Sequence, residues 1–209
     1  MTGRGETVSE NEMAVHGHGA LMEESPYAIP SRKLTMWLFI ISDAVTFGAF
    51  LFSYGYIRVS TANWVRPFES GSVINVSVMT MVLITSSLTM LGAVDASKAG
   101  DKAKAIRFLY STMALGALFA ALHLREWFDL FGRNITLSSG LFGQTFFTIT
   151  GLHLLHVISG VIALLVVGLK YSSGRLTPGH VESTGLYWHF VDLVWMFVVP
   201  LVYLTNIAR

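Results

Sequence analysis

The polar side chains best suited to chemistry in this chain lie inside apolar stretches. His189 and Asp192 are three residues apart in TGLYWHFVDLVWMFVVPLVYL, and His153 and His156 are three apart in TGLHLLHVISG. That spacing places each pair on one helix face, because side chains three or four residues apart are neighbours. Asp43 lies in another apolar stretch, WLFIISDAVTF. Histidines and carboxylates in such stretches point to a metal site, a haem site, a proton path or a buried hydrogen-bond network.

These four interpretations make different demands on the sequence. A metal site would take its ligands from the two histidines of one stretch and from His189 and Asp192 of the other, but the Glu-x-x-His pairs of carboxylate-bridged bundles are absent. Two histidines on one helix cannot both be axial ligands of one haem iron. A proton path would use the aspartates and histidines as relay sites. From the residues alone, a network that orients the helices is favoured over the proton path.

Composition indicates a membrane protein. Of the 209 residues, 53% are hydrophobic and 13% are charged, whereas soluble domains carry about 25% charged residues. The formal net charge is +1 and no basic stripe is present, which argues against nucleic-acid binding. Because the chain has no cysteine, it has no disulfide, iron–sulfur cluster or Cys-based metal site.

Five stretches are apolar and long enough to cross about 30 Å of hydrocarbon. They cover approximately residues 34–57, 71–94, 105–130, 140–169 and 182–207, after a polar tail over residues 1–33 that we expect to be flexible and uncleaved. Since a helix satisfies its own backbone in lipid, the expected fold is all-α, an integral membrane bundle of five transmembrane helices. Nine of the 14 Lys and Arg residues lie on the tail side, which predicts a cytoplasmic N terminus and a C terminus outside.

The end of the third span and the linker before it are rich in charge. His123 and Glu126 lie one turn apart in LHLREWFDL, and we interpret this outer-end polar cluster as an interfacial anchor rather than a catalytic site. The linker DASKAGDKAKAIR is expected to form a short helix-like segment whose basic side chains attract anionic lipid headgroups.

Four stretches resemble subunit III of the haem–copper respiratory oxidases, over residues from about 34 to the end of the chain. FIISDAVTFGAFLF resembles the family's Ser-acidic segment, with Asp43 at the acidic position, and LREWFDL resembles its Glu-aromatic pair. SGLFGQTFFTITGLHLLHVISG and ESTGLYWHFVDLVWMFVVPLVYL are similar to its last two motifs in order and spacing. The positions matched in these last three stretches are Glu126, Trp127, His153, His156, Gly160, Glu182, Tyr187, Trp188, His189, Asp192 and Trp195.

The resemblance implies a subunit without haem, copper or a catalytic residue of its own. It implies that subunit I performs the oxygen chemistry, and that this chain holds phospholipid in a cleft and supports proton uptake. Subunit I, subunit II and phospholipid are the partners implied, in a bacterial cell membrane, and membership of a respiratory supercomplex stays open. The short form without two further N-terminal helices resembles subunits of both cytochrome c and quinol oxidases, of which we favour the cytochrome c type.

The polar residues inside the spans are assigned to a buried polar network made of Asp43, His153, His156, Glu182, His189 and Asp192. We predict that His189 and Asp192 bind no cofactor and form hydrogen bonds with neighbouring helices. Two alternatives remain: a stand-alone proton channel or transporter that uses Asp43, His189 and Asp192, and an accessory subunit of a nitric oxide reductase.

Overall fold

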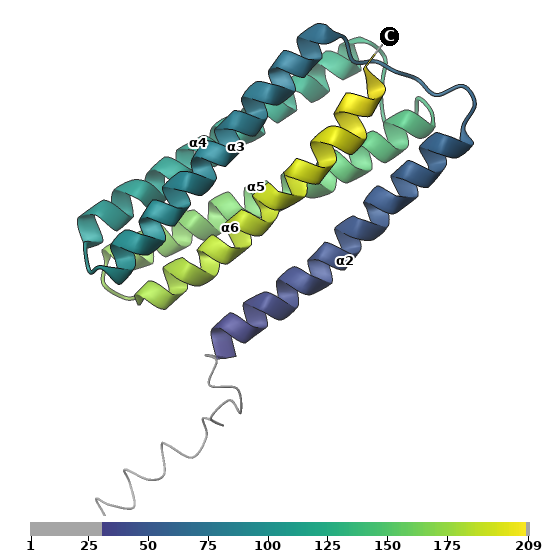
Figure 1. Ribbon diagram of the computed structural model, residues 1–209. Coiled ribbons are helices and arrows are strands. Elements are labelled where there is room, and N and C mark those ends of the chain that lie inside the picture. Colours follow the sequence, from purple (N-terminus) through teal and green to yellow (C-terminus); the bar gives the residue numbers. More distant parts are fainter. Residues whose placement is uncertain (1–30, 208–209) are drawn as a thin grey trace, which may run out of the picture. The chain divides into compact units, whose positions relative to one another are not determined.

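The computed structural model describes residues 31–207, and this part of the chain is helical (Figure 1). In chain order its elements are α2 (Ser31–Ser60), α3 (Ser70–Lys98), α4 (Lys102–Gly132), α5 (Leu141–Ser172), α6 (Pro178–Val198), the π-helix η1 (Val199–Tyr203) and the 3₁₀-helix η2 (Leu204–Asn206). The five long helices are apolar enough to cross a membrane. The bounds of α2 to α5 lie within four residues of the predicted spans, and α6 together with η1 and η2 covers residues 178–206, against the predicted 182–207. The all-α fold with five spans is therefore confirmed. Most of the predicted tail lies outside the described residues.

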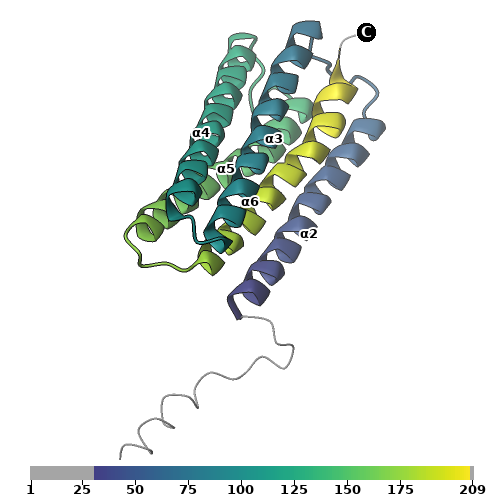
Figure 2. The same cartoon turned by 60° about the vertical axis from the view of Figure 1, so that its left-hand side comes forward.

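Four of the helices close into a bundle, and the fifth runs beside it. α3 packs against α4 and α6, and α5 packs against the same two helices (Figure 2). α2 lies along α6 in both views and buries one stripe, formed by Ile40, Phe47 and Tyr54 at seven-residue intervals. That spacing is typical of a single narrow helix seam. Only 11% of the most apolar window of α2 is buried inside the chain, against 50% for α6.

The interior of the bundle is organised around two tryptophans of α6. Trp188 and Trp195 are seven residues apart and almost completely buried. The indole of Trp188 fits against two glycines of neighbouring helices: a methyl group added at Gly160 would lie 2.9 Å from the ring, and one added at Gly116 would collide with it. Trp188 Nε1 also donates a hydrogen bond to Ser86 Oγ at 3.0 Å. Both tryptophans of the last motif are therefore core residues, and Trp188 requires small neighbours.

The two ends of the bundle differ in their connections. We call one the tight-turn end, because it carries the short connections over residues 99–101 and 173–177. The other is the long-loop end, which carries residues 61–69 and 133–140 and the end of η2. Which end faces the cytoplasm stays a prediction.

The linker between α3 and α4 is a turn, so the expectation of a short helix-like segment is wrong. α3 continues to Lys98, and Gly100 then adopts a left-handed backbone with φ +79°. The side chain of Asp101 accepts a hydrogen bond of 3.0 Å from Lys104 N and thereby caps α4. A left-handed glycine followed by an N-cap residue ends one helix and starts the next within three residues.

Near the C terminus, α6 passes into the π-helical turn that contains Pro200. Proline has no amide hydrogen to complete the α-helical pattern, and a π-turn is one way to accommodate it. As a result Tyr203 and Asn206 are both buried, and their polar groups enter the interior of the long-loop end.

Candidate functional site

Asp43 and His156 form a close polar contact between α2 and α5. His156 Nε2 lies 3.0 Å from Asp43 Oδ2, and the two side chains are 13% and 14% exposed. The other ring nitrogen, Nδ1, lies 2.7 Å from the Leu152 carbonyl oxygen. Because a carbonyl only accepts, Nδ1 is the ring nitrogen that donates to Leu152, which leaves Nε2 to face the Asp43 carboxylate. The contact of Nε2 with Oδ2 lies within ion-pair distance, although it does not have the geometry of a hydrogen bond.

His189 and Asp192, on α6, have different surroundings. Asp192 Oδ2 accepts a hydrogen bond of 2.6 Å from Ser87 Oγ on α3, while its Oδ1 has no partner within residues 31–207. His189 is half-buried, and its ring interacts electrostatically with Asp192 on the same helix. Asp192 thus joins α6 to α3, whereas His189 lies at the edge of the bundle.

Glu182 lies near the start of α6, at the tight-turn end. Its Oε1 is 3.4 Å from Lys98 Nζ, at the end of α3, and the two side chains are partly exposed. The structure therefore places Glu182 in a surface contact between two helix ends, away from the polar groups at the middle of the spans.

His123 and His153 lie in the bundle interior and are both fully buried. The His153 ring stacks on Trp195 with a centroid distance of 5.0 Å, and the His123 ring meets the edge of the same indole at 5.5 Å. Phe119 covers both imidazoles, with centroids at 5.7 and 5.8 Å. None of the four ring nitrogens has a hydrogen-bond partner within residues 31–207.

Glu126 lies one turn beyond His123 and is also buried. Its Oε2 accepts a hydrogen bond of 2.8 Å from the Tyr203 hydroxyl, and the Asn75 amide lies near the carboxyl group. Oε1 has no partner of normal hydrogen-bond geometry within residues 31–207. The interpretation of His123 and Glu126 as an interfacial anchor is wrong, because both side chains face the bundle rather than the membrane boundary.

The sequence carries a signal for this burial. The buried residues of α4 alternate in steps of four and three from Ala105 to Leu130, and both polar residues fall on that stripe.

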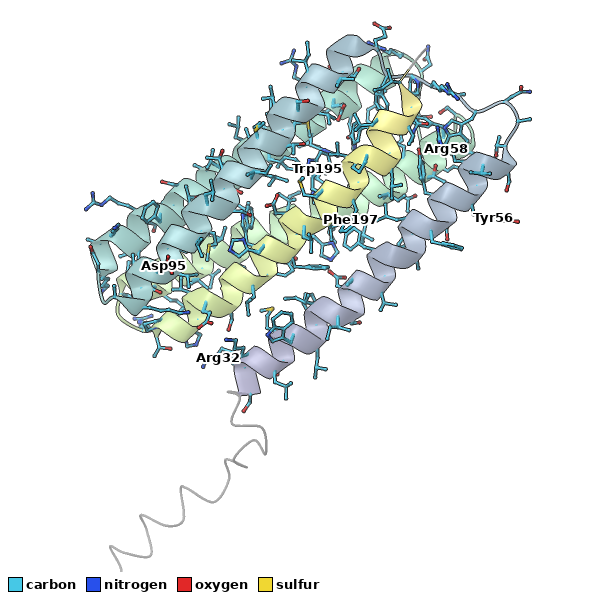
Figure 3. All side chains as sticks on the ribbon, viewed as in Figure 1. Arg32, Tyr56, Arg58, Asp95, Trp195 and Phe197 are labelled. Atoms are coloured by element: carbon cyan, nitrogen blue, oxygen red, sulfur yellow. The ribbon has the colours of Figure 1, made fainter. Side chains whose placement is uncertain are left out.

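A further cluster, which sequence reasoning missed, joins α2 to the C-terminal turns. Asn206 Oδ1 accepts hydrogen bonds from Arg58 Nε at 3.2 Å and from Trp64 Nε1 at 2.7 Å. Its amide nitrogen donates to the Tyr54 hydroxyl, and Arg58 also donates to the Thr205 carbonyl at 2.6 Å. Figure 3 shows Arg58 at the end of α2 that lies near these turns. No local pattern predicts such contacts, since the partners are more than 140 residues apart.

The histidines and carboxylates of residues 31–207 lie in separate places in the bundle. Among residues 31–207 there is no group of three or more His, Asp or Glu side chains arranged to hold a metal ion. His153 and His156 share a helix but have different neighbours: one stacks on Trp195, and the other contacts Asp43.

Comparison with known proteins assigns the family. The model of the family described as cytochrome c oxidase subunit III matches residues 29–206. A cytochrome c oxidase subunit 3 of Corynebacterium diphtheriae is 32% identical over 170 residues, which are 78% of this chain and 83% of that protein. A quinol oxidase subunit 3 of Bacillus subtilis is 30% identical over 201 residues, 94% of this chain and 98% of that protein.

A longer relative joins two subunits in one chain. It is a haem–copper oxidase subunit I+III of Aeropyrum pernix, 28% identical over 193 residues, which are 88% of this chain and 24% of that protein. The family match begins before α2 and ends with η2, so it includes the five helices and every polar contact described above. This chain is a multi-pass membrane protein and belongs to the subunit III family of the haem–copper oxidases.

Proposed function

We propose that this chain is the non-catalytic subunit III of a proton-pumping terminal oxidase in a bacterial cell membrane. The observation that carries the proposal is the family match across residues 29–206, which spans all five described helices. The dispersed polar contacts support a role in packing rather than in ligation, because no set of side chains within residues 31–207 resembles a metal site. Haem and copper would be held by partner subunits, which would reduce oxygen to water.

Subunit I is the proposed direct partner, with subunit II in the same complex. The Aeropyrum pernix relative supports this, because its name assigns subunits I and III to one chain. α2 offers a surface for such a contact: Leu38, Val45 and Phe52 are 60%, 69% and 78% exposed and recur every seven residues. This exposed stripe lies on the side of α2 away from its buried stripe, because a two-residue offset turns a helix by about 200°.

Phospholipid is the second proposed partner. An apolar groove of about 250 Å³ runs between α2 and α6. It is lined by Ala44, Phe47, Gly48, Leu51, Phe190, Leu193, Val194 and Phe197. Figure 3 shows Phe197 on the side of α6 that faces α2, whereas Trp195 is buried in the bundle. The lining has hardly any polar surface, so an acyl chain is the occupant that it suits.

The Asp43–His156 pair is the proposed contribution to proton uptake. His156 Nε2 lies 3.0 Å from Asp43 Oδ2, and its other ring nitrogen lies against the Leu152 carbonyl, so the imidazole joins a carboxyl group of α2 to the backbone of α5. An ionisable pair at membrane depth is a functional candidate, because charge there is costly. Asp43 and His156 are both near the middle of their helices, so the pair would lie about halfway across the membrane.

The electron donor is proposed to be cytochrome c. Relatives named for both donors match this chain at 30–32% identity, so the comparison alone does not choose between them. The purified complex should oxidise reduced cytochrome c rapidly and a soluble quinol slowly. The reverse order would assign the chain to a quinol oxidase.

Removal of this subunit from the complex tests the whole proposal. The oxidase without it should keep its haem spectrum and initial oxygen consumption, but it should pump fewer protons per electron and lose activity sooner during turnover. Loss of the haem signals from an assembled subunit I would contradict a non-catalytic role. Proton flux through the chain alone in liposomes would favour a stand-alone proton channel or transporter. Co-purification with a nitric oxide reductase would favour an accessory subunit of that enzyme.

A further inference from the structure

Four neighbouring side chains of the bundle interior carry polar atoms that meet no partner. They are both ring nitrogens of His123 and of His153, Oε1 of Glu126 and Nε1 of Trp127, and the absence of partners holds for residues 31–207. Each of these atoms is shielded from the surface. Buried polar groups are nearly always hydrogen-bonded to protein or to ordered water, because an unpaired group loses its hydration without replacement. Six such atoms in one region therefore require an explanation.

The region adjoins a polar pocket at the long-loop end. This pocket has a volume of about 240 Å³ and is lined in part by Asn75, Arg125, Glu126, Asp129 and Arg133. It is far larger than the roughly 15 Å³ that a single water molecule requires, and its lining supplies donors and acceptors. Glu126 belongs both to this lining and to the buried set, so it connects the two.

From Glu126 the unpartnered groups lead inward. His123 lies one turn before Glu126 on α4, and its ring is 5.7 Å from that of Trp127. His123 and His153 contact the same indole, Trp195, with ring centroids at 5.5 and 5.0 Å. The four polar side chains thus form a row that begins at the pocket and ends at His153.

The row ends at His153 because both ring nitrogens of the next histidine, His156, already face other groups. His156 follows His153 by one turn, but its Nδ1 lies against the Leu152 carbonyl and its Nε2 against Asp43. It therefore has no ring nitrogen left for a further partner. The row opens toward the long-loop end and is closed toward the Asp43–His156 pair.

We propose that His123, Glu126, Trp127 and His153 bind a chain of ordered water molecules that continues from the polar pocket into the bundle. Water suits the set better than an ion does. Trp127 Nε1 only donates, which disfavours a cation, and the Glu126 carboxyl only accepts when ionised, which disfavours an anion. Water both donates and accepts, and it can serve all six atoms. The chain would give the interior of this subunit an aqueous connection to one membrane face.

Direct observation of the water is the first test. A density map of the intact oxidase that resolves ordered water should show density within about 3.2 Å of Glu126 Oε1, of Trp127 Nε1 and of at least one nitrogen of each imidazole. Dry, close-packed surroundings at both histidines would overturn the proposal. This test needs no variant, so a folding defect cannot obscure it.

Thiol labelling then tests the connection to the surface. The chain has no cysteine, so His123→Cys supplies the one thiol of this subunit in the assembled oxidase. Phe146→Cys is the matched control, because Phe146 is just as buried but lies among aromatic rings nearer the long-loop end. A small cationic methanethiosulfonate should modify His123→Cys at least tenfold faster, measured as the mass shift of this subunit.

The labelling rates are compared only for variants that assemble into the oxidase. Both variants are first checked for co-purification with the other subunits and for the unchanged haem spectrum. Equal modification rates at the two positions would overturn the connection to the surface even where the map shows water. If His123→Cys does not assemble, Asn75→Cys in the lining of the pocket is labelled instead. A modification rate at Asn75→Cys no faster than at Phe146→Cys would also overturn the connection to the surface.

Discussion

At the seam between α2 and the bundle, polar side chains contact one another, whereas inside the bundle several buried polar groups have no partner within residues 31–207. At the seam, His156 lies 3.0 Å from Asp43, and Asn206 binds side chains that follow or end α2. In the interior, His123 and His153 are fully buried, yet residues 31–207 offer their rings no hydrogen bond. The two regions therefore depend on different forces.

The difference predicts which substitutions each region tolerates. The seam should be sensitive to loss of charge and of hydrogen bonds, because an abandoned partner would remain in a poorly hydrated place. The interior should be sensitive to added volume, because its side chains interlock around Trp188 and Trp195.

The largest expected effect is the loss of His156 at the seam. His156→Leu leaves the Asp43 carboxyl without its partner, and we expect the free energy of unfolding to fall by about 3–5 kcal/mol. Denaturation of the purified subunit with SDS in mixed micelles measures this value. The double variant Asp43→Leu with His156→Leu should recover most of the loss, since no charge is left unpaired. A double variant as unstable as the single one would mean that packing, not the pair, joins the helices.

Asn206 should be the next most sensitive position. Asn206→Ala removes the acceptor of Arg58 and Trp64 and leaves the Trp64 indole unpaired, so we expect a loss of about 2–3 kcal/mol. Asn63→Ala, at an exposed position of the same loop end, should change stability by less than about 0.5 kcal/mol. Protease cleavage in the loop over residues 61–69 should also become faster in the Asn206 variant. If the two variants were equally stable, the hydrogen bonds of Asn206 would not stabilise the contact between α2 and the C-terminal turns.

A pair of glycine substitutions compares the two regions by volume. Gly116→Ala places a methyl group against the Trp188 ring, whereas Gly48→Ala on α2 meets nothing within 4 Å. We expect the first to destabilise by about 1–3 kcal/mol and the second to be neutral or slightly stabilising. The same mixed-micelle denaturation measures both. Equal tolerance would show that the bundle can repack around Trp188, contrary to the close fit described here.

The sequence was sufficient for the spans, and it was insufficient for the contacts between them. Long apolar runs predicted the five helices because hydrocarbon thickness fixes their length. The place of His123 and Glu126 near a span end predicts an interfacial position, whereas the four-and-three spacing of α4 marks them as buried. The contact between Arg58 and Asn206 joins residues 148 positions apart, and only the packed structure brings such residues together. The aspartate–histidine contact is of the same kind, because each motif is local to its own helix.

The smallest expected effect belongs to the histidine that has no protein partner. His153→Leu places an apolar side chain of nearly the same volume against Trp195 and removes two nitrogens that bond to nothing within residues 31–207. We therefore expect a loss of about 1 kcal/mol or less, the scale of a water-mediated hydrogen bond. His156→Leu, three residues further along the same helix, should cost several times more, because it abandons Asp43. Equal losses at the two positions would show that His153 has a partner as strong as a carboxylate, and the contrast between seam and interior would then fail.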